Sequence, residues 1–149
     1  MKKFLSLLML TIGVAAAKAQ TPVNWTFSTK KISDKTYEVH LTAMLQSGWH
    51  LYSQAQPEDA IVIPTGFKFT NNPLLKLDGN TREIGKLEKF KDEKLGISAN
   101  QYSRKVDFVQ IIKLKGNAKT NISGSVEYQT CDDKKCLPPK TVNFSVDIK

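Results

Sequence analysis

Two cysteines, Cys131 and Cys136, are the residues whose type and spacing are best suited to chemistry. Four polar residues, Asp132-Asp133-Lys134-Lys135, separate them, and this pattern predicts a tight turn that lets the two sulfurs face each other. A bond between them would close a ring of about six residues, which stabilises a fold by only ~2 kcal/mol in the loop-entropy model. The position of the pair is therefore poorly suited to a disulfide whose role is to stabilise the fold. Spacing alone leaves open whether the bond is permanent or reversible.

The charges between the cysteines distinguish the two sulfurs. Asp132 follows Cys131, whereas Lys135 precedes Cys136. Carboxylates disfavour a thiolate and ammonium groups favour it, so Cys136 is expected to ionise more easily. We therefore predict that Cys136 attacks a partner disulfide and that Cys131 resolves the mixed disulfide.

The first 19 residues have the pattern of a signal peptide. Two lysines precede an apolar run from Phe4 to Ala17, and Ala17-Lys18-Ala19 is a small-x-small cleavage site. We expect residues 1–19 to be removed and residues 20–149 to form one soluble, periplasmic domain. Three of the lysines lie in the leader, so the formal charge falls from +8 to +5 for the remaining 130 residues. Thiols in such an oxidising compartment form disulfides unless they are actively reduced.

Strand-type alternation dominates the rest of the sequence and predicts an all-β sandwich. The run Val106–Leu114 is apolar in both phases over part of its length, so it is expected at the centre of a sheet. The segment from Leu87 to Leu95 is expected to be a loop with one helical turn. The other expected strands are 23–28, 37–45, 61–63, 67–70, 122–130 and 142–148.

Two further motifs carry a family resemblance. The cysteine segment begins Tyr128-Gln129-Thr130-Cys131 and ends Cys136-Leu137-Pro138-Pro139, and Gly48-Trp49-His50-Leu51-Tyr52-Ser53 lies upstream. Over most of residues 24–148 the chain resembles the DsbD N-terminal domains, the periplasmic domains of thiol:disulfide interchange proteins. The resemblance implies an immunoglobulin-like sandwich with a redox-active cysteine hairpin. It also implies thiol:disulfide interchange activity with no cofactor.

The resemblance further implies partners and supporting residues. A membrane thiol reductase would donate electrons, and periplasmic thioredoxin-like or disulfide isomerase proteins would accept them. Cys131 and Cys136 would be catalytic, with His50 and Tyr52 beside them. A loop that shields the bond in the family matches Asp92-Glu93-Lys94-Leu95-Gly96, so Asp92, Glu93 and Leu95 are the predicted supporting residues, with Leu95 in place of an aromatic. The best-known members continue into membrane and thioredoxin-like domains, whereas this sequence stops at Lys149. The reductant is therefore expected to be a separate protein.

Other functions have weaker support in the sequence. The main alternative is a secreted binding module with a purely structural disulfide. Copper could bind Cys131, Cys136, His40, His50 and Met44, but the two histidines are far apart in sequence and no second cysteine pair is present, so no metal site is predicted. No hydrolase motif is found. The lysine-rich stretch 86–94 also contains acidic residues, which argues against a nucleic-acid partner.

Overall fold

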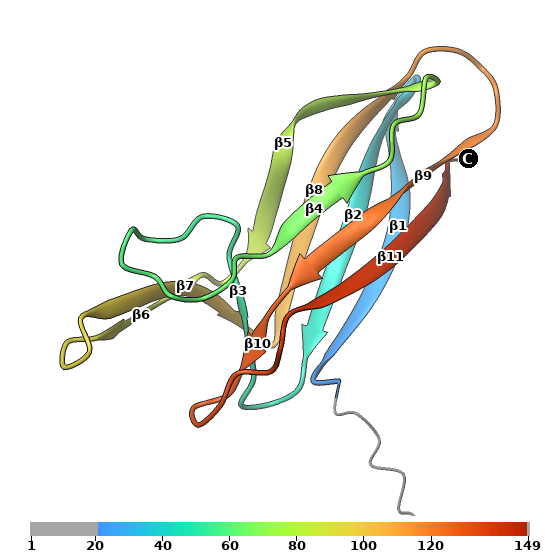
Figure 1. Ribbon diagram of the computed structural model, residues 1–149. Helices are drawn as coiled ribbons and strands as arrows, with labels where there is room; N and C mark the ends of the chain where they lie inside the picture. Colours follow the sequence, from blue (N-terminus) through green and yellow to red (C-terminus); the bar gives the residue numbers. More distant parts are fainter. Residues whose placement is uncertain (1–20, 149) are drawn as a thin grey trace, which may run out of the picture.

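The chain folds into antiparallel strands without a helix in the computed structural model, which describes residues 21–148 (Figure 1). The predicted signal peptide lies outside these residues. No helix long and apolar enough to cross a membrane occurs within them. The strands are β1 (Val23–Ser33), β2 (Thr36–Leu45), β3 (His50–Tyr52), β4 (Gly66–Phe69), β5 (Leu75–Gly85), β6 (Glu88–Asp92), β7 (Ile97–Ser103), β8 (Lys105–Leu114), β9 (Thr120–Tyr128), β10 (Thr130–Cys131) and β11 (Lys140–Ile148).

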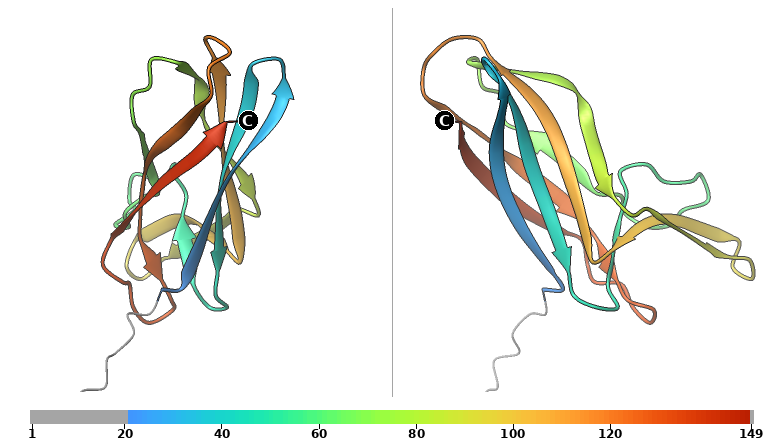
Figure 2. Two further views of the ribbon diagram at one scale, coloured as in Figure 1. Left: turned by 90° about the vertical axis from the view of Figure 1, so that its right-hand side faces the viewer. Right: turned by 180° about the vertical axis from the view of Figure 1, so that it is seen from behind.

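Two sheets form the sandwich. One has the order β1-β2-β8-β5, and the other has the order β11-β9-β4 (Figures 1 and 2). The core lies between them because alternate residues of each strand are apolar and point inward. Aromatic rings join the two layers: Phe67 of β4 lies 5.0 Å from Phe108 of β8, and Phe27 of β1 lies 5.2 Å from Phe144 of β11, measured between ring centroids.

A third, smaller sheet extends the sandwich at one end, with the order β10-β3-β7-β6 (Figure 1). Its β6–β7 hairpin projects away from the two main layers, as Figure 1 and the right-hand view of Figure 2 show. This sheet brings the Cys131 strand next to the His50 strand, although 83 residues separate His50 from Asp133 in the cysteine turn. The position of the functional site is therefore set by this small sheet.

Most predicted strands are confirmed, and β8 lies between β2 and β5 as expected from its two apolar phases. Two predictions were wrong. Residues 61–63 form no strand, because this short apolar run lies in the long loop between β3 and β4. The segment from Leu87 to Leu95 is not a loop with a helical turn. It contains β6, which pairs with β7 from Glu88 to Asp92.

Strand β5 was not predicted from the sequence. Its alternation stops after Leu77, because a bulge at Gly79 shifts the register against β8 between Asp78 and Arg82. The buried side chain of Gln110 on β8 supplies hydrogen bonds to the backbone of the bulge. Its amide donates to the carbonyl oxygens of Asp78 and Gly79 at 3.4 and 3.2 Å. The bulge therefore interrupts the apolar alternation by which β5 could have been predicted.

Candidate functional site

The predicted cysteine hairpin is present. Cys131 ends β10 and pairs with Cys136 through an isolated bridge, and the two sulfurs form a disulfide. The Cα atoms are 4.0 Å apart, slightly closer than the ~4.4 Å at which the usual range for disulfides begins. The backbone N–H of Asp132 donates to the carbonyl oxygen of Lys135 at 2.9 Å and closes the turn. The bond therefore spans a hydrogen-bonded four-residue turn.

Asp132 organises this turn through its side chain. Its Oδ1 accepts hydrogen bonds from the backbone N–H groups of Lys134 and Lys135, at 2.8 and 2.7 Å. These two bonds hold the pKa of the Asp132 carboxyl below its usual value, and the nearby lysine charges add to the effect. The carboxylate that the sequence places beside Cys131 thus shapes the turn.

The turn should loosen in acid, because a carboxyl whose pKa is lowered by folding stabilises the structure only while it is ionised. The contribution is present above the unfolded pKa of ~3.9 and is lost as the pH falls through the lower folded value. We expect the amide NMR signals of Lys134 and Lys135 to shift together with a midpoint below ~3.9. Asp132→Asn, which keeps the Oδ1 acceptor, should remove this transition. A midpoint at or above the ordinary value would contradict the role of Asp132.

The two cysteines differ in accessibility. Cys131 is 3% exposed, whereas Cys136 is exposed. A partner disulfide can approach Cys136 without rearranging the sandwich, while Cys131 lies against Tyr52 and Ala99 in a small apolar cluster. This asymmetry is independent of the charge argument and favours the same order of attack. The order itself remains a prediction.

His50 and Tyr52 lie beside the cysteines. Strand β3 pairs with β10 so that His50 is directly opposite Cys131, and opposite residues of an antiparallel pair share one face of the sheet. Tyr52 follows two residues later on the same face, and its burial raises the pKa of its hydroxyl. Their supporting roles remain predictions.

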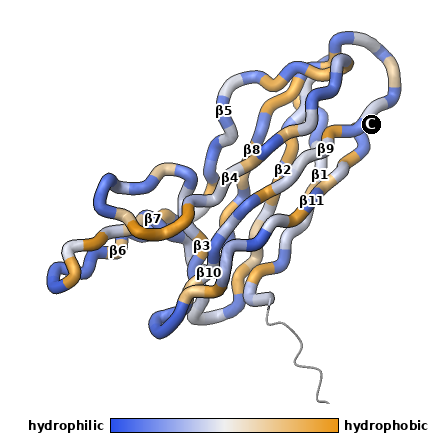
Figure 3. Tube along the Cα trace, viewed as in Figure 1, coloured by the Kyte–Doolittle hydropathy of each residue, from blue (hydrophilic) through white to orange (hydrophobic). Residues whose placement is uncertain are grey.

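A cavity of about 690 Å³ opens at these residues. Its walls come from the hairpin, β3, β6, β7 and the loop between β3 and β4, which lies beside β7 in both views of the fold (Figures 1 and 2). Figure 3 shows a hydrophobic stretch where that loop passes β7. The lining residues are His50, Tyr52, Ile61, Val62, Phe90, Ile97, Ser98, Ala99, Gln101, Gln129, Cys131, Asp132, Asp133 and Cys136.

The matched shielding loop is at the tip of the β6–β7 hairpin. Leu95 is 70% exposed there, and neither Leu95, Asp92 nor Glu93 lines the cavity. The Asp92 carboxylate accepts from the N–H groups of Lys94 and Leu95, so it forms the tip of the hairpin. The predicted supporting roles of Asp92, Glu93 and Leu95 rest only on the family resemblance.

Some apolar lining residues were not predicted from the sequence: Phe90, Ile97 and Ala99 of this hairpin, and Ile61 and Val62 of the β3–β4 loop. Phe90 is a single apolar residue between charged neighbours, so alternation could not identify its strand. Ile61 and Val62 belong to an apolar run that predicted a strand, whereas the structure places this run in a loop at the cavity.

The copper ligands considered above do not all lie together, since only Cys131, Cys136 and His50 line the cysteine cavity. His40 lies on β2, where its Nδ1 contacts the Asp107 carboxylate at 2.7 Å, and neither His40 nor Met44 lines the cysteine cavity. Among residues 21–148, no group of three or more histidines, cysteines or carboxylates is arranged to hold a metal ion.

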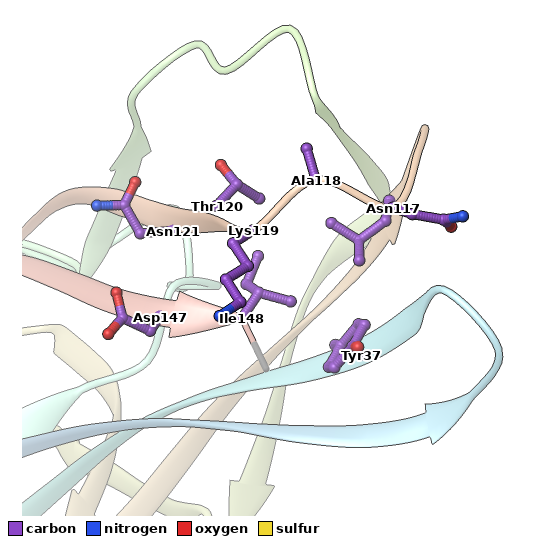
Figure 4. A pocket seen from close by; sticks show the side chains of 9 residues that line it. Tyr37, Asn117, Ala118, Lys119, Thr120, Asn121, Asp147 and Ile148 are labelled. Atoms are coloured by element: carbon purple, nitrogen blue, oxygen red, sulfur yellow. The ribbon is translucent and has the colours of Figure 1, made fainter.

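A larger cavity, about 830 Å³, lies at the opposite end of the sandwich (Figure 4). Tyr37, Lys119, Asn121 and Asp147 line it together with apolar residues, but it contains neither a cysteine nor a histidine. Because the reactive groups are at the other end, we assign the functional site to the smaller cavity.

Comparisons with solved structures support the fold. The N-terminal domain of DsbD from Neisseria meningitidis, in its reduced form, aligns with a TM-score of 0.50 and 19% identity over 77% of this chain and 78% of that chain. The N-terminal periplasmic domain of ScsB from Proteus mirabilis aligns with a TM-score of 0.53 and 19% identity, over 85% of this chain and 44% of that one. The predicted immunoglobulin-like sandwich is confirmed.

A third structure is a complex between the DsbD and PilB N-terminal domains of Neisseria meningitidis, with a TM-score of 0.51 and 15% identity over 88% of this chain and 87% of that chain. No curated protein matches the sequence significantly. The family model described as the N-terminal region of thiol:disulfide interchange protein DsbD matches residues 16–148. The chain therefore belongs to the family of DsbD N-terminal domains, as its cysteine hairpin and the Gly48–Ser53 stretch together predicted.

Proposed function

We propose that this chain exchanges electrons with other periplasmic proteins through the Cys131–Cys136 pair. A membrane thiol reductase reduces the disulfide, and thioredoxin-like or disulfide isomerase proteins receive the electrons. The observation that carries the proposal is the disulfide between a buried and an exposed cysteine at the mouth of a cavity. Membership of the DsbD N-terminal family supports the exchange chemistry. The complex of a related domain with PilB supports a protein as acceptor.

The exchange proceeds in two steps that conserve atoms and electrons. The Cys136 thiolate attacks one sulfur of the partner disulfide, forming a mixed disulfide and releasing the other partner sulfur as a thiolate. The Cys131 thiolate then attacks Cys136, which breaks the mixed disulfide. The partner leaves as a dithiol with two electrons, and Cys131–Cys136 is restored. The donor reduces it by the reverse sequence.

The reduction potential and the melting temperature test this proposal against a structural disulfide. We expect a potential above about −300 mV, in the range of exchange proteins. Because the ring of about six residues contributes only ~2 kcal/mol, reduction should lower Tm by about 10 °C or less and leave the protein folded. A potential well below about −300 mV, with unfolding on reduction, would favour the secreted binding module with a structural bond.

A further inference from the structure

A row of polar side chains crosses the whole of the small sheet. His50 on β3 is opposite Cys131 on one side and opposite Ser103 of β7 on the other. Glu88 of β6 is paired with Gln101, two residues from Ser103, and therefore reaches Ser103 diagonally. The side chains of Cys131, His50, Ser103 and Glu88 thus share one face and lie in sequence across four strands.

Hydrogen bonds connect the far end of this row to the imidazole. The Ser103 hydroxyl donates to Oε2 of Glu88 at 2.8 Å, because an ionised carboxylate can only accept. That hydroxyl has one proton, so its oxygen must accept from the His50 Nδ1, which lies 3.1 Å away. This bond favours the tautomer of neutral His50 that carries its proton on Nδ1 and its lone pair on Nε2.

The Nε2 atom faces the cysteine hairpin, 3.3 Å from Oδ1 of Asp133. The Asp133 carboxylate competes only weakly for a proton on Nε2, because its side chain is 89% exposed to water. When Nε2 takes a proton, the resulting imidazolium would donate to Asp133 and to Ser103. The uncharged Ser103 and Gln101 are its β7 neighbours. Five ionisable groups line the cavity with His50: Tyr52, Cys131, Asp132, Asp133 and Cys136. Glu88 is connected to His50 through Ser103, and Lys134 and Lys135 complete the cysteine turn.

We infer that Glu88, acting through Ser103, is a positioning residue that holds His50 in the tautomer able to deprotonate Cys131. The inference rests on the proposed function, because only exchange requires a Cys131 thiolate. In the resolving step the Cys131 S–H bond breaks, its electron pair stays on sulfur and the proton moves to Nε2. The thiolate attacks Cys136, and the imidazolium returns the proton to the departing partner thiolate.

Burial explains why Cys131 needs this assistance. A thiolate loses solvation in an apolar environment, and Cys131 is 3% exposed beside Tyr52 and Ala99. The exposed Cys136 has water and two adjacent lysines to stabilise its charge. The positioning residues should therefore affect the second step of exchange and not the first.

Ellman's reagent separates the two steps. The reduced protein releases one thionitrobenzoate when Cys136 attacks and a second when Cys131 displaces the mixed disulfide. We expect His50→Asn to slow the second release about 100-fold, as for a lost general base. Glu88→Gln and Ser103→Ala should slow it about tenfold near pH 7 and move its pH profile to higher pH, because the Cys131 thiol must then ionise without help from the imidazole. The first release should change little. Ser103→Thr, which keeps the hydroxyl, should restore the second.

A direct measurement of the tautomer accompanies the kinetics. Nitrogen-15 NMR of neutral His50 should show the proton mainly on Nδ1 in the unaltered protein and mainly on Nε2 in Ser103→Ala. His40, which lies on β2, provides an internal reference, and Glu127→Gln on the exposed face of β9 is the matched charge control. Unchanged tautomer and unchanged second release in Glu88→Gln and Ser103→Ala would overturn the inference. A low reduction potential would instead reject the proposed function, whatever the tautomer.

Discussion

With Cys131 replaced by alanine, the reduced protein should capture periplasmic partners as stable mixed disulfides. Cys136 is exposed and adjacent to Lys135, so it can attack a partner disulfide, and the resolving sulfur is then missing. We expect discrete adducts on non-reducing gels of a periplasmic extract, released by dithiothreitol and identified by mass spectrometry. Exchange then stops halfway, at the mixed disulfide between Cys136 and its partner.

Cys136→Ala is the matched control for this experiment. It leaves the buried Cys131 as the only thiol, so we expect at least about tenfold fewer adducts. Both variants lack the disulfide, and a difference between them therefore reports which sulfur attacks. Equal yields, or more adducts with Cys131 alone, would reject the predicted order of attack. An absence of adducts in both variants would count against the relay.

The largest loss of stability is expected at Gly124 in the middle of β9. The glycine is paired with Phe69 of β4 on one side and with Phe144 of β11 on the other, and the two aromatic rings meet with their centroids 5.8 Å apart. A Cβ atom at this position would overlap the backbone carbonyl oxygen of Lys68 and lie 2.9 Å from the Phe144 ring. Backbone atoms in a paired strand cannot move aside without breaking the ladder.

We therefore expect Gly124→Ala to lower the free energy of unfolding by about 3 kcal/mol, as for other overpacking substitutions. Urea denaturation of the oxidised protein measures this. Gly66→Ala in β4 is the control, because a Cβ there meets no atom within 4 Å, and its effect should stay within about 0.5 kcal/mol. Similar losses for both variants would mean that close approach at Gly124 is not the cause.

Local sequence was sufficient to predict the cysteine hairpin and the sandwich fold. The disulfide between Cys131 and Cys136 follows from a spacing of five residues, and the alternation of apolar residues in β1, β2, β8 and β11 predicted the sandwich. These features depend on contacts within one turn or on burial of one strand face. Both can be recognised from residues that are neighbours in the sequence.

The cavity walls could not be predicted in the same way. Ser103 meets His50 across 53 residues, and this contact exists only because β3 and β7 pair. Strand β6 has charged residues on both sides of Phe90, since one face is open to water and the other contributes only that ring to the cavity. Apolar residues alternate along a strand only where one face of the strand is buried. A strand at the edge of a small sheet buries too few side chains to show this alternation.

The short ladders of the small sheet have a consequence for fluctuations. Strand β3 forms three residue pairs with β7 and only two with β10, whereas β1 and β2 are paired over ten positions. Fewer hydrogen bonds and less buried apolar surface mean a lower free energy of local opening. The sheet that holds the cysteines can therefore open transiently and close again while the amide protons of the sandwich core stay protected from exchange with solvent.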